Sequence, residues 1–363
     1  MISVVIPLFN KEGLIGTTIN TVLSQTYQDF EIIVVNDGST DDSATEVEKI
    51  NDSRIRLINQ KNAGVSAARN RGIHEAKGEY LALLDGDDEW KPDYLKTQFE
   101  LTQKYPECDI YCVNYCFRDL AGQITPTVIN HLSFKGIDGV LSNYFEVASC
   151  SHPPICSISI LARKGIFESV GGFPIGIKSG EDLLTWARLA CRYKIAYSLK
   201  PLAIFVESAS DTNVSKAVQR SGGEQYVLDE LLKLYHEHPN IVGLKDYVIR
   251  WYKIYCVLCI EINNNHKILE LAPAAIKFGG SKLQFIILYI LGLLPAAMGK
   301  VWHYCVVVMD ICFFSGLASL GYTGGGDVYV NDSGACGRRT DFVIEYLVCS
   351  GILYAALQSF LSF

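Results

Sequence analysis

Three aspartates follow directly on a run of apolar residues in YLALLDGDDEW, residues 80–90. They are Asp85, Asp87 and Asp88. Like charges this close repel and raise one another's pKa, and a bound cation removes that conflict. Mg²⁺ and Mn²⁺ prefer such hard oxygen ligands and bind through one or two carboxylates together with substrate phosphates. We therefore predict a divalent metal, Mn²⁺ or Mg²⁺, with a diphosphate bound to it; the alternative is an acidic surface turn.

Two further stretches offer groups that could hold a nucleotide. In VVNDGSTDDS, residues 34–43, Asn36 and Asp37 end an apolar run and could hydrogen-bond a nucleobase. They could equally belong to a turn before an N-capped helix. In NAGVSAARNRGI, residues 62–73, small residues would let a nucleotide approach, with Arg69 or the helix N-terminus near phosphate. Close packing of the helix on a sheet, with solvated arginines, explains that stretch equally well.

A second pair of acids, Glu181 and Asp182, lies in SGEDLLTWARL. The pattern places both in the first turn of a helix, where the helix dipole stabilises acids in any protein. From the residues alone, helix capping is therefore a sufficient explanation. The functional alternative is a general base, since a carboxylate can take a proton from an attacking hydroxyl.

Alternating strand and helix patterns in the first hundred residues must position these groups. Short runs rich in Val, Ile and Leu predict buried strands at 3–9, 30–37, 54–60, 80–85 and 109–115. Helical patterns lie between them, which predicts a mostly parallel α/β sheet flanked by helices. In such a sheet, ligands bind at the carboxyl ends of the strands, where Asp37 and Asp85 fall.

Composition excludes several classes of protein. The chain has 363 residues and a net charge of −7, which argues against nucleic acid as a partner. Its 12 cysteines are scattered, and no C-x-x-C pair is flanked by a second such pair or by spaced histidines, so we expect reduced thiols rather than zinc or disulfides. No G-x-G-x-x-G follows the first strand and no P-loop motif is present, so a dinucleotide oxidoreductase or P-loop NTPase is not expected. MISVVIPLFN reads as a strand rather than a signal peptide, so we expect a cytoplasmic catalytic part.

The chain divides by pattern into three predicted regions: a catalytic domain at 1–215, a helical extension at 216–281 and a hydrophobic tail at 282–363. The tail holds the apolar stretches 283–299, 301–321 and 346–363. All three are marginal as membrane spans: the seventeen residues of 283–299 at about 1.5 Å rise cover less than a hydrocarbon core of about 30 Å, and Asp310 lies within 301–321. We expect membrane contact through 283–321 and 346–363; the alternative is buried helices. The Gly-rich stretch 322–341 has no functional interpretation.

The motifs together resemble family 2 glycosyltransferases of the GT-A fold. VVIPLFNKE, VVNDGSTDDS, NAGVSAARNRGI, LLDGDDEW and GGF...GEDLLTWARLA occur in the order and at about the spacing of that family, over residues 1–210. The resemblance implies an inverting transfer of a sugar from a nucleotide diphosphate sugar, most often UDP-linked, to an acceptor hydroxyl. A cytoplasmic, membrane-associated enzyme that adds one sugar to a cell-surface or lipid-linked glycan is the favoured hypothesis, placed at the cytoplasmic face of the membrane.

The same resemblance assigns roles to individual residues. Pro7 and Asp37 would flank the uracil; Asn36, Asn62 and Arg69 are further candidates for binding the nucleotide, beside the residues that the resemblance assigns. Asp85 would approach the ribose or the metal, and Asp87 would ligate the metal. Asp182 would be the catalytic base, and Glu181 would orient the acceptor.

The chain departs from its relatives at two points. A downstream His that completes the site in some relatives is missing from 203–216, where only Asp211 could substitute. The Q-x-x-R-W motif of processive synthases is replaced by YVIRW, with Tyr247 in the Gln position, which favours single addition. Two alternatives stay open: a sugar-1-phosphate nucleotidyltransferase and a non-catalytic nucleotide-sugar binding protein.

Overall fold

A computed structural model describes residues 1–207 and 222–293. The chain divides into two compact units, residues 1–248 and 249–363. Asp211 and the predicted tail beyond residue 293, including 301–321, 322–341 and 346–363, lie outside the described residues.

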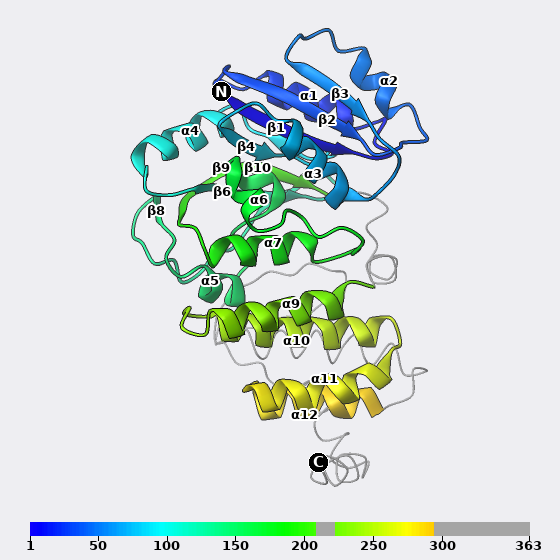
Figure 1. Cartoon of the computed structure of the whole chain (residues 1–363), viewed down its shortest axis with the longest axis vertical. Coiled ribbons are helices and arrows are strands. Elements are labelled where there is room, and N and C mark those ends of the chain that lie inside the picture. The colour runs from blue at the N-terminus through cyan, green and yellow to red at the C-terminus, as the bar shows by residue number, and fades with distance from the viewer. Residues whose placement is uncertain (208–221, 294–363) are drawn as a thin grey trace. The chain divides into compact units, whose positions relative to one another are not determined.

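The first unit alternates strands and helices through its first hundred residues, as the sequence predicts (Figure 1). Its first elements are β1 (Ile2–Leu8), α1 (Ile15–Leu23), β2 (Phe30–Asn36), α2 (Ser43–Glu48), β3 (Ile55–Asn59), α3 (Val65–Glu75), β4 (Tyr80–Leu83), β5 (Glu89–Trp90) and α4 (Tyr94–Lys104). Then follow β6 (Ile110–Arg118), β7 (Ile124–Pro126), β8 (Asp138–Val140), α5 (Tyr144–Cys150), a 3₁₀ turn at Ser157–Ser159, β9 (Ile160–Arg163), α6 (Gly165–Ser169), α7 (Glu181–Ala190), β10 (Ile195–Val206) and α9 (Glu224–Glu237).

One ten-stranded sheet organises this unit, in the order β3-β2-β1-β4-β9-β6-β10-β5, with β7 beside β6 and β8 beside β10. The predicted parallel arrangement holds for β3, β2, β1 and β4, which pair with one another in parallel. The second half is mixed, because β9 runs antiparallel to both β4 and β6. The prediction of an α/β sheet flanked by helices is confirmed, and antiparallel pairs after β4 make it less uniformly parallel than the pattern indicated.

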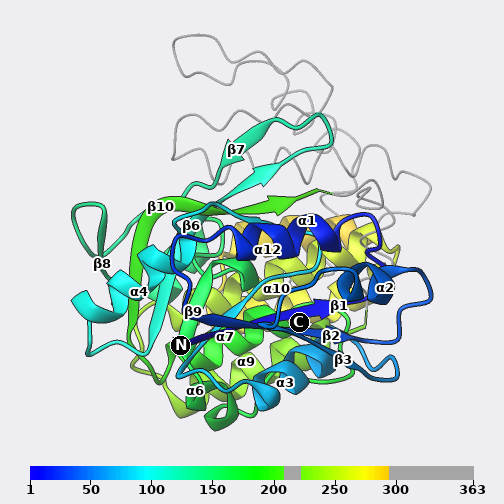
Figure 2. The same ribbon diagram turned by 90° about the horizontal axis from the view of Figure 1, so that it is seen from above.

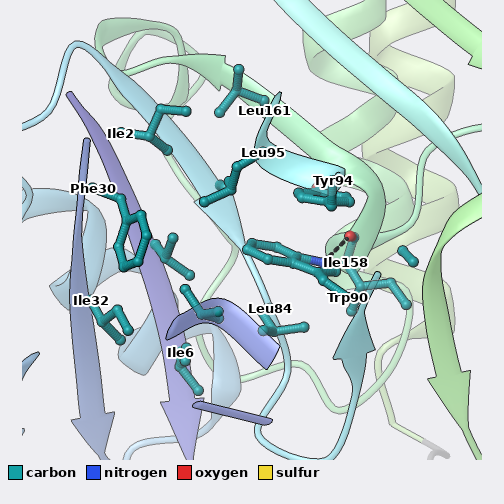
Figure 3. Close-up of a cluster of buried hydrophobic side chains, with 14 of the residues drawn as sticks. Ile2, Ile6, Phe30, Ile32, Leu84, Trp90, Tyr94, Leu95, Ile158 and Leu161 are labelled. Atoms are coloured by element: carbon teal, nitrogen blue, oxygen red, sulfur yellow. Dashed lines mark hydrogen bonds between the residues drawn. The ribbon is translucent and has the colours of Figure 1, made fainter. Parts of the chain in front are cut away.

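Side chains alternate between two layers of helices. Figure 2 shows α1 and α4 on one side of the central strands and α3 and α6 on the other. The residues of β1 that face the first layer meet a continuous apolar cluster: Ile2, Val4, Ile6 and Leu8 pack with Ile15, Ile19, Trp90 and Tyr94. In Figure 3 the Trp90 indole N–H donates to the Ile158 carbonyl at 2.8 Å. The Trp90 ring stacks on Tyr94 at 3.9 Å, so this core anchors the segment directly after the aspartates.

The opposite face of β1 packs against α3 at very short range. A Cβ added at Gly72 would lie 2.2 Å from the Val5 Cγ1, so only glycine allows this approach. Val5 and Gly72 are thus the contact that seats α3 on the sheet. This seating matters for the site, because α3 also bears Arg69 and Asn70.

The order in which successive strands are added to the sheet reverses direction at β1. Strands β2 and β3 lie on one side of β1, and β4 lies on the other. Where strand order reverses in this way, the loops at the carboxyl ends of the two strands part and leave room for a ligand. The loop after β1 begins at Phe9 and the one after β4 contains Asp85, Asp87 and Asp88, so these two loops flank that point.

The boundary between the units falls within α10 (Leu244–Glu261), and the second unit continues with α11 (Asn265–Phe278) and α12 (Lys282–Leu293). Helices α11 and α12 lie side by side (Figure 1), and a Cβ at Gly292 would come within 3.2 Å of the Ile268 Cβ. The predicted apolar stretch 283–299 begins in α12, whose described part buries Phe285, Leu288 and Ile290. Within residues 1–207 and 222–293, none of the helices has the length and hydropathy that a membrane span requires.

Candidate active site

The three aspartates after β4 occupy different environments. Asp85 and Asp87 are partly exposed, with 25% and 22% of their side chains accessible. Asp88 is buried, and its Oδ1 accepts a hydrogen bond from the Val206 amide at 2.8 Å. Burial, together with repulsion from Asp85 and Asp87, raises the pKa of Asp88 well above its ordinary value. Asp88 therefore holds the end of β10, and Asp85 and Asp87 are the two acids open to a ligand.

Arg69 connects two acidic groups that are far apart in the sequence. Its guanidinium lies 2.8 Å from the Asp85 Oδ1 and 3.3 Å from the Glu181 Oε1, with 5% of the side chain exposed. Burial alone would lower the pKa of Arg69, but the neighbouring carboxylates Asp85 and Glu181 outweigh it and raise that pKa. The solvated arginine considered from the sequence is therefore found at Arg71, which pairs with Glu75 on the surface, and not at Arg69.

The Glu181 and Asp182 pair opens α7 and is only partly accessible. The preceding Gly180 has φ +80°, a left-handed conformation that suits glycine and turns the chain into the helix. Burial, followed by the charge of Asp182, raises the pKa of Glu181 to about 7. Burial also raises the pKa of Asp182, and Arg69 opposes that rise. A carboxyl whose pKa is raised towards neutrality is suited to accept a proton in a reaction near pH 7.

Asn70 fixes the loop that delivers this pair, a role that motif reading of the sequence missed. Its side-chain amide donates to the Phe173 carbonyl, and its Oδ1 accepts from the Phe173 amide, both at 2.8 Å. A Cβ at Gly172 would come within 2.7 Å of the Asn70 Oδ1, so glycine is required there. The Phe173 ring in turn lies 5.2 Å from the Arg69 guanidinium. The GGF turn is thus attached to α3, which brings α7 close to Arg69.

Lys11, in the loop after β1, forms the contact across the point where strand order reverses. Its Nζ lies 2.6 Å from the Asp87 Oδ2. Burial raises the pKa of Asp87, and the Lys11 charge opposes that rise. In the sequence, Lys11 follows directly on PLFN at the end of the first strand, and this position is the signal that could have identified it as a site residue. Lys11 and Arg69 thus neutralise part of the repulsion between the aspartates, which was the basis for predicting a metal.

The donor set still suits a divalent cation. Asp85 and Asp87 offer partly exposed carboxylate oxygens, and Mg²⁺ or Mn²⁺ binds through one or two such groups when phosphates supply further ligands. Among the residues that the structure describes, no group of three or more His, Cys, Asp and Glu side chains could hold a metal by itself. The residues therefore fit a cation that arrives with a diphosphate, with Asp87 and Asp85 as its protein ligands.

Two loops beside the site are joined by reciprocal hydrogen bonds. The Asn10 Oδ1 accepts from the Thr40 amide at 2.8 Å, and the Ser39 Oγ accepts from the Asn10 amide at 3.1 Å. The Ser43 Oγ accepts from the Lys11 amide at 2.7 Å. The Glu12 Oε2 accepts from the Asp42 amide at 2.9 Å. We call this set the loop clasp; it ties residues 10–12 to residues 39–43.

Asp37, predicted to contact the nucleobase, already has several partners within the chain. Its carboxylate accepts from the Gln60 side chain at 2.7 Å and from the amides of Ala63 and Gly64 at 2.9 and 2.8 Å. It therefore shapes the loop before α3. A carboxylate offers about four acceptor positions, so a base N–H could use the remaining one.

The other predicted nucleotide contacts surround Asp37. The Asn36 side-chain amide donates a hydrogen bond to the Asn59 Oδ1, and the Asn36 Oδ1 accepts one from the Ser39 amide. Asn62 is exposed and approaches Gly38, where an added Cβ would lie 2.8 Å from the Asn62 nitrogen. Pro7 is buried within β1, with Val35 of β2 opposite it. The structure brings these residues to one edge of the sheet, and their roles on a nucleotide stay predictions.

The mixed α/β sheet flanked by helices agrees with the GT-A fold that the motifs predicted. Residues 3–150 match the family described as Glycosyl transferase family 2. The chain therefore contains a family 2 glycosyltransferase domain, which confirms the resemblance that the motifs indicated. An uncharacterized glycosyltransferase of Rickettsia felis is 34% identical over 203 residues, covering 53% of this chain and 31% of that protein. Glycosyltransferase GlyA of Streptococcus pneumoniae is 33% identical over 188 residues, covering 50% and 27%. The matched region is thus about a third or less of these relatives' length.

Solved structures of low sequence identity share the fold. S. aureus TarS 1–349 in complex with UDP-GlcNAc has a TM-score of 0.60 at 18% identity, covering 86% of this chain and 89% of that one. The mannosyltransferase PcManGT from Pyrobaculum calidifontis, in complex with GDP-Man and Mn²⁺, has a TM-score of 0.53 at 17% identity, covering 87% and 82%. At such identities the likeness concerns the fold alone.

Proposed function

We propose that this chain transfers one sugar, with inversion, from a nucleotide diphosphate sugar to an acceptor hydroxyl, with UDP as the nucleotide. The observation that carries the proposal is the Arg69 bridge. It joins Asp85, at the strand edge where a nucleotide would bind, to Glu181, beside the candidate base. One buried cation thereby couples the acids of the two halves of a transfer site. The TarS complex with UDP-GlcNAc supports UDP as the nucleotide.

The residues divide the chemistry between them. Asp182 takes the proton of the attacking acceptor hydroxyl, on the face of the sugar opposite the departing diphosphate. Glu181, held by Arg69, orients the acceptor. Asp87 and Asp85 would hold a divalent cation, which would neutralise the charge that develops on the leaving diphosphate. The nucleoside side of the site is lined by Asp37, Asn36, Asn62 and Pro7.

The acceptor and the location follow from the apolar C-terminal sequence. We place the enzyme at the cytoplasmic face of the cell membrane, in contact with it through residues 283–321 and 346–363. Its acceptor is then a lipid-linked glycan or another precursor of a cell-surface polysaccharide. The Tyr247 that replaces the Gln of the processive motif is buried against Phe145 at 5.4 Å, which supports single addition.

The test is release of nucleotide diphosphate by the purified full chain. UDP-, GDP- and TDP-sugars would be offered with Mn²⁺ and a lipid extract, and we expect UDP release that requires the extract. NMR of the product should show inverted anomeric configuration. Absence of release from every donor would exclude a transferase. Binding of a UDP-sugar without release would favour a non-catalytic binder, and pyrophosphate formed from a sugar-1-phosphate and a nucleotide triphosphate would favour a nucleotidyltransferase.

We expect the transfer rate to rise with pH as the candidate base loses its proton. Burial raises the pKa of Asp182, the candidate base, above its ordinary value, and the adjoining Glu181, whose own pKa is raised to about 7, interacts with it. As the pH falls through the raised pKa of Asp182, this base becomes protonated, so kcat/KM should fall, by up to about tenfold per pH unit.

Glu181→Gln tests the origin of this titration. It removes the carboxyl whose pKa is raised to about 7 and leaves Asp182 beside Arg69, so any part of the titration that belongs to Glu181 disappears and the midpoint of the pH profile should move to lower pH. Glu168→Gln, at an exposed glutamate of α6, is the control and should leave the profile unchanged. A midpoint that stays in place in Glu181→Gln would assign the titration to another group.

A further inference from the structure

Lys11 is held rigidly at the edge of the candidate metal site. Its amide donates to the Ser43 Oγ at 2.7 Å, and its carbonyl accepts from the amides of Leu14 and Ile15, both at 2.9 Å. With its backbone fixed on both sides, only the side chain of Lys11 is free to move. That side chain is 31% exposed, and its Nζ rests on the Asp87 Oδ2.

The charges around the three aspartates leave Asp87 as the exchangeable partner. Asp85 is paired with a buried arginine, and Asp88 is buried on the Val206 amide. Asp87 is paired with a lysine that, like itself, reaches solvent. Among the described residues, Lys11 and Arg69 make the ion pairs to this group of acids. An ammonium on a flexible stem can leave its partner far more easily than a buried, doubly paired guanidinium.

A divalent cation and Lys11 would need the same carboxylate. The ligand that brings the cation is a diphosphate, whose oxygens attract an ammonium as strongly as a carboxylate does. The loop after β1 and the loop after β4 flank the point where strand order reverses, so Lys11 already lies beside the place where such a sheet binds its ligand.

We propose that Lys11 exchanges partners when the nucleotide donor binds: it neutralises Asp87 in the empty site, and it moves to a phosphate oxygen when a divalent cation takes Asp87. This inference rests on the proposed function. Lys11 then weakens the binding of the cation alone and strengthens the binding of the cation together with the nucleotide. The site is thereby selective for the cation and diphosphate together.

The two effects have opposite signs, which makes the proposal testable by binding alone. In Lys11→Met, the affinity for Mn²⁺ without nucleotide should rise about three- to tenfold, because the competing ammonium is gone. The affinity for UDP in the presence of Mn²⁺ should fall about tenfold, because a charge-assisted contact to phosphate is lost. Mn²⁺ binding is measured by electron paramagnetic resonance of the free ion, and UDP binding by calorimetry, both on the full chain.

Lys49→Met is the matched control, because Lys49 pairs with Glu46 on the exposed face of α2 and lies in neither of the two loops. It should change neither affinity. Lys11→Gln should show the same changes in Mn²⁺ and UDP affinity as Lys11→Met. Its unfolding midpoint should equal that of the unaltered chain, so that misfolding does not explain the changes.

Unchanged or weaker Mn²⁺ binding in both Lys11 variants would overturn the exchange, as would unchanged UDP binding. If the unaltered chain binds neither UDP nor a UDP-sugar with Mn²⁺, the proposed function itself fails. If it binds them and the Lys11 variants behave like it, only this inference fails.

Discussion

Replacing Asp182 with asparagine should lower the turnover number about 10²- to 10⁴-fold and leave the affinity for the nucleotide donor unchanged. Asparagine keeps the size of the side chain and an oxygen that can accept from the Leu183 amide, as Asp182 does at 2.7 Å. What it lacks is the ability to take a proton. Initial rates of nucleotide diphosphate release, together with calorimetric donor binding, measure the two quantities.

The fold should tolerate this change. Burial raises the pKa of Asp182, so its charged form is disfavoured and the neutral amide should leave the unfolding midpoint equal or higher. Asp246→Asn is the matched control, since Asp246 is an exposed acid in the first turn of α10. It should leave turnover unchanged. Full activity in Asp182→Asn would reduce Asp182 to the helix-capping role that the sequence alone allowed.

Replacing Arg69 with methionine should lower the free energy of unfolding by about 3–5 kcal/mol and abolish transfer. Methionine fills much of the same space, so the loss comes from charge. Asp85 and Glu181 would remain in a partly buried site without their shared cation. Removing one partner of a buried ion pair leaves an uncompensated charge, which is the reason for the large expected effect. Chemical denaturation measures the change at neutral pH.

Arg71→Met provides the control in the same helix. Arg71 is 48% exposed and pairs with Glu75 one turn away, an arrangement that contributes about 0.3–0.5 kcal/mol. Its replacement should therefore change stability little and leave transfer intact. Equal losses in the two variants would mean that α3 depends on its arginines generally, and the bridge between Asp85 and Glu181 would lose its special role.

The sequence predicts the frame of this molecule well because local patterns determine it. The runs that end at Asn36 and Leu83 are short, apolar and rich in β-branched residues or leucine, and they become parallel strands with acids at their carboxyl ends. The mixed second half of the sheet was harder to foresee. Whether β9 runs parallel or antiparallel to β4 depends on long-range packing, which periodicity does not encode.

The site was predicted as a set of residues but not as a set of partners. Asp85 and Glu181 were both singled out, but not the link between them. Arg69 makes that link because the fold brings it to Glu181, which lies 112 residues further along the chain. A signal was present, since Ser66, Arg69 and Ile73 share the buried face of α3. Asp37 shows the opposite difficulty. Its motif indicated a ligand, and the structure uses most of its acceptor capacity on Gln60, Ala63 and Gly64.

The loop clasp between residues 10–12 and residues 39–43 has a thermodynamic consequence for ligand binding. Ordering the backbone of a mobile loop opposes association by roughly 1–2 kcal/mol of conformational entropy per residue. Here the side chains of Asn10, Ser39 and Ser43 already hold that backbone in place. The entropy has thus been lost during folding rather than at the moment of encounter. On this side of the site a ligand meets a preorganised wall, and its affinity reflects the contacts it makes there.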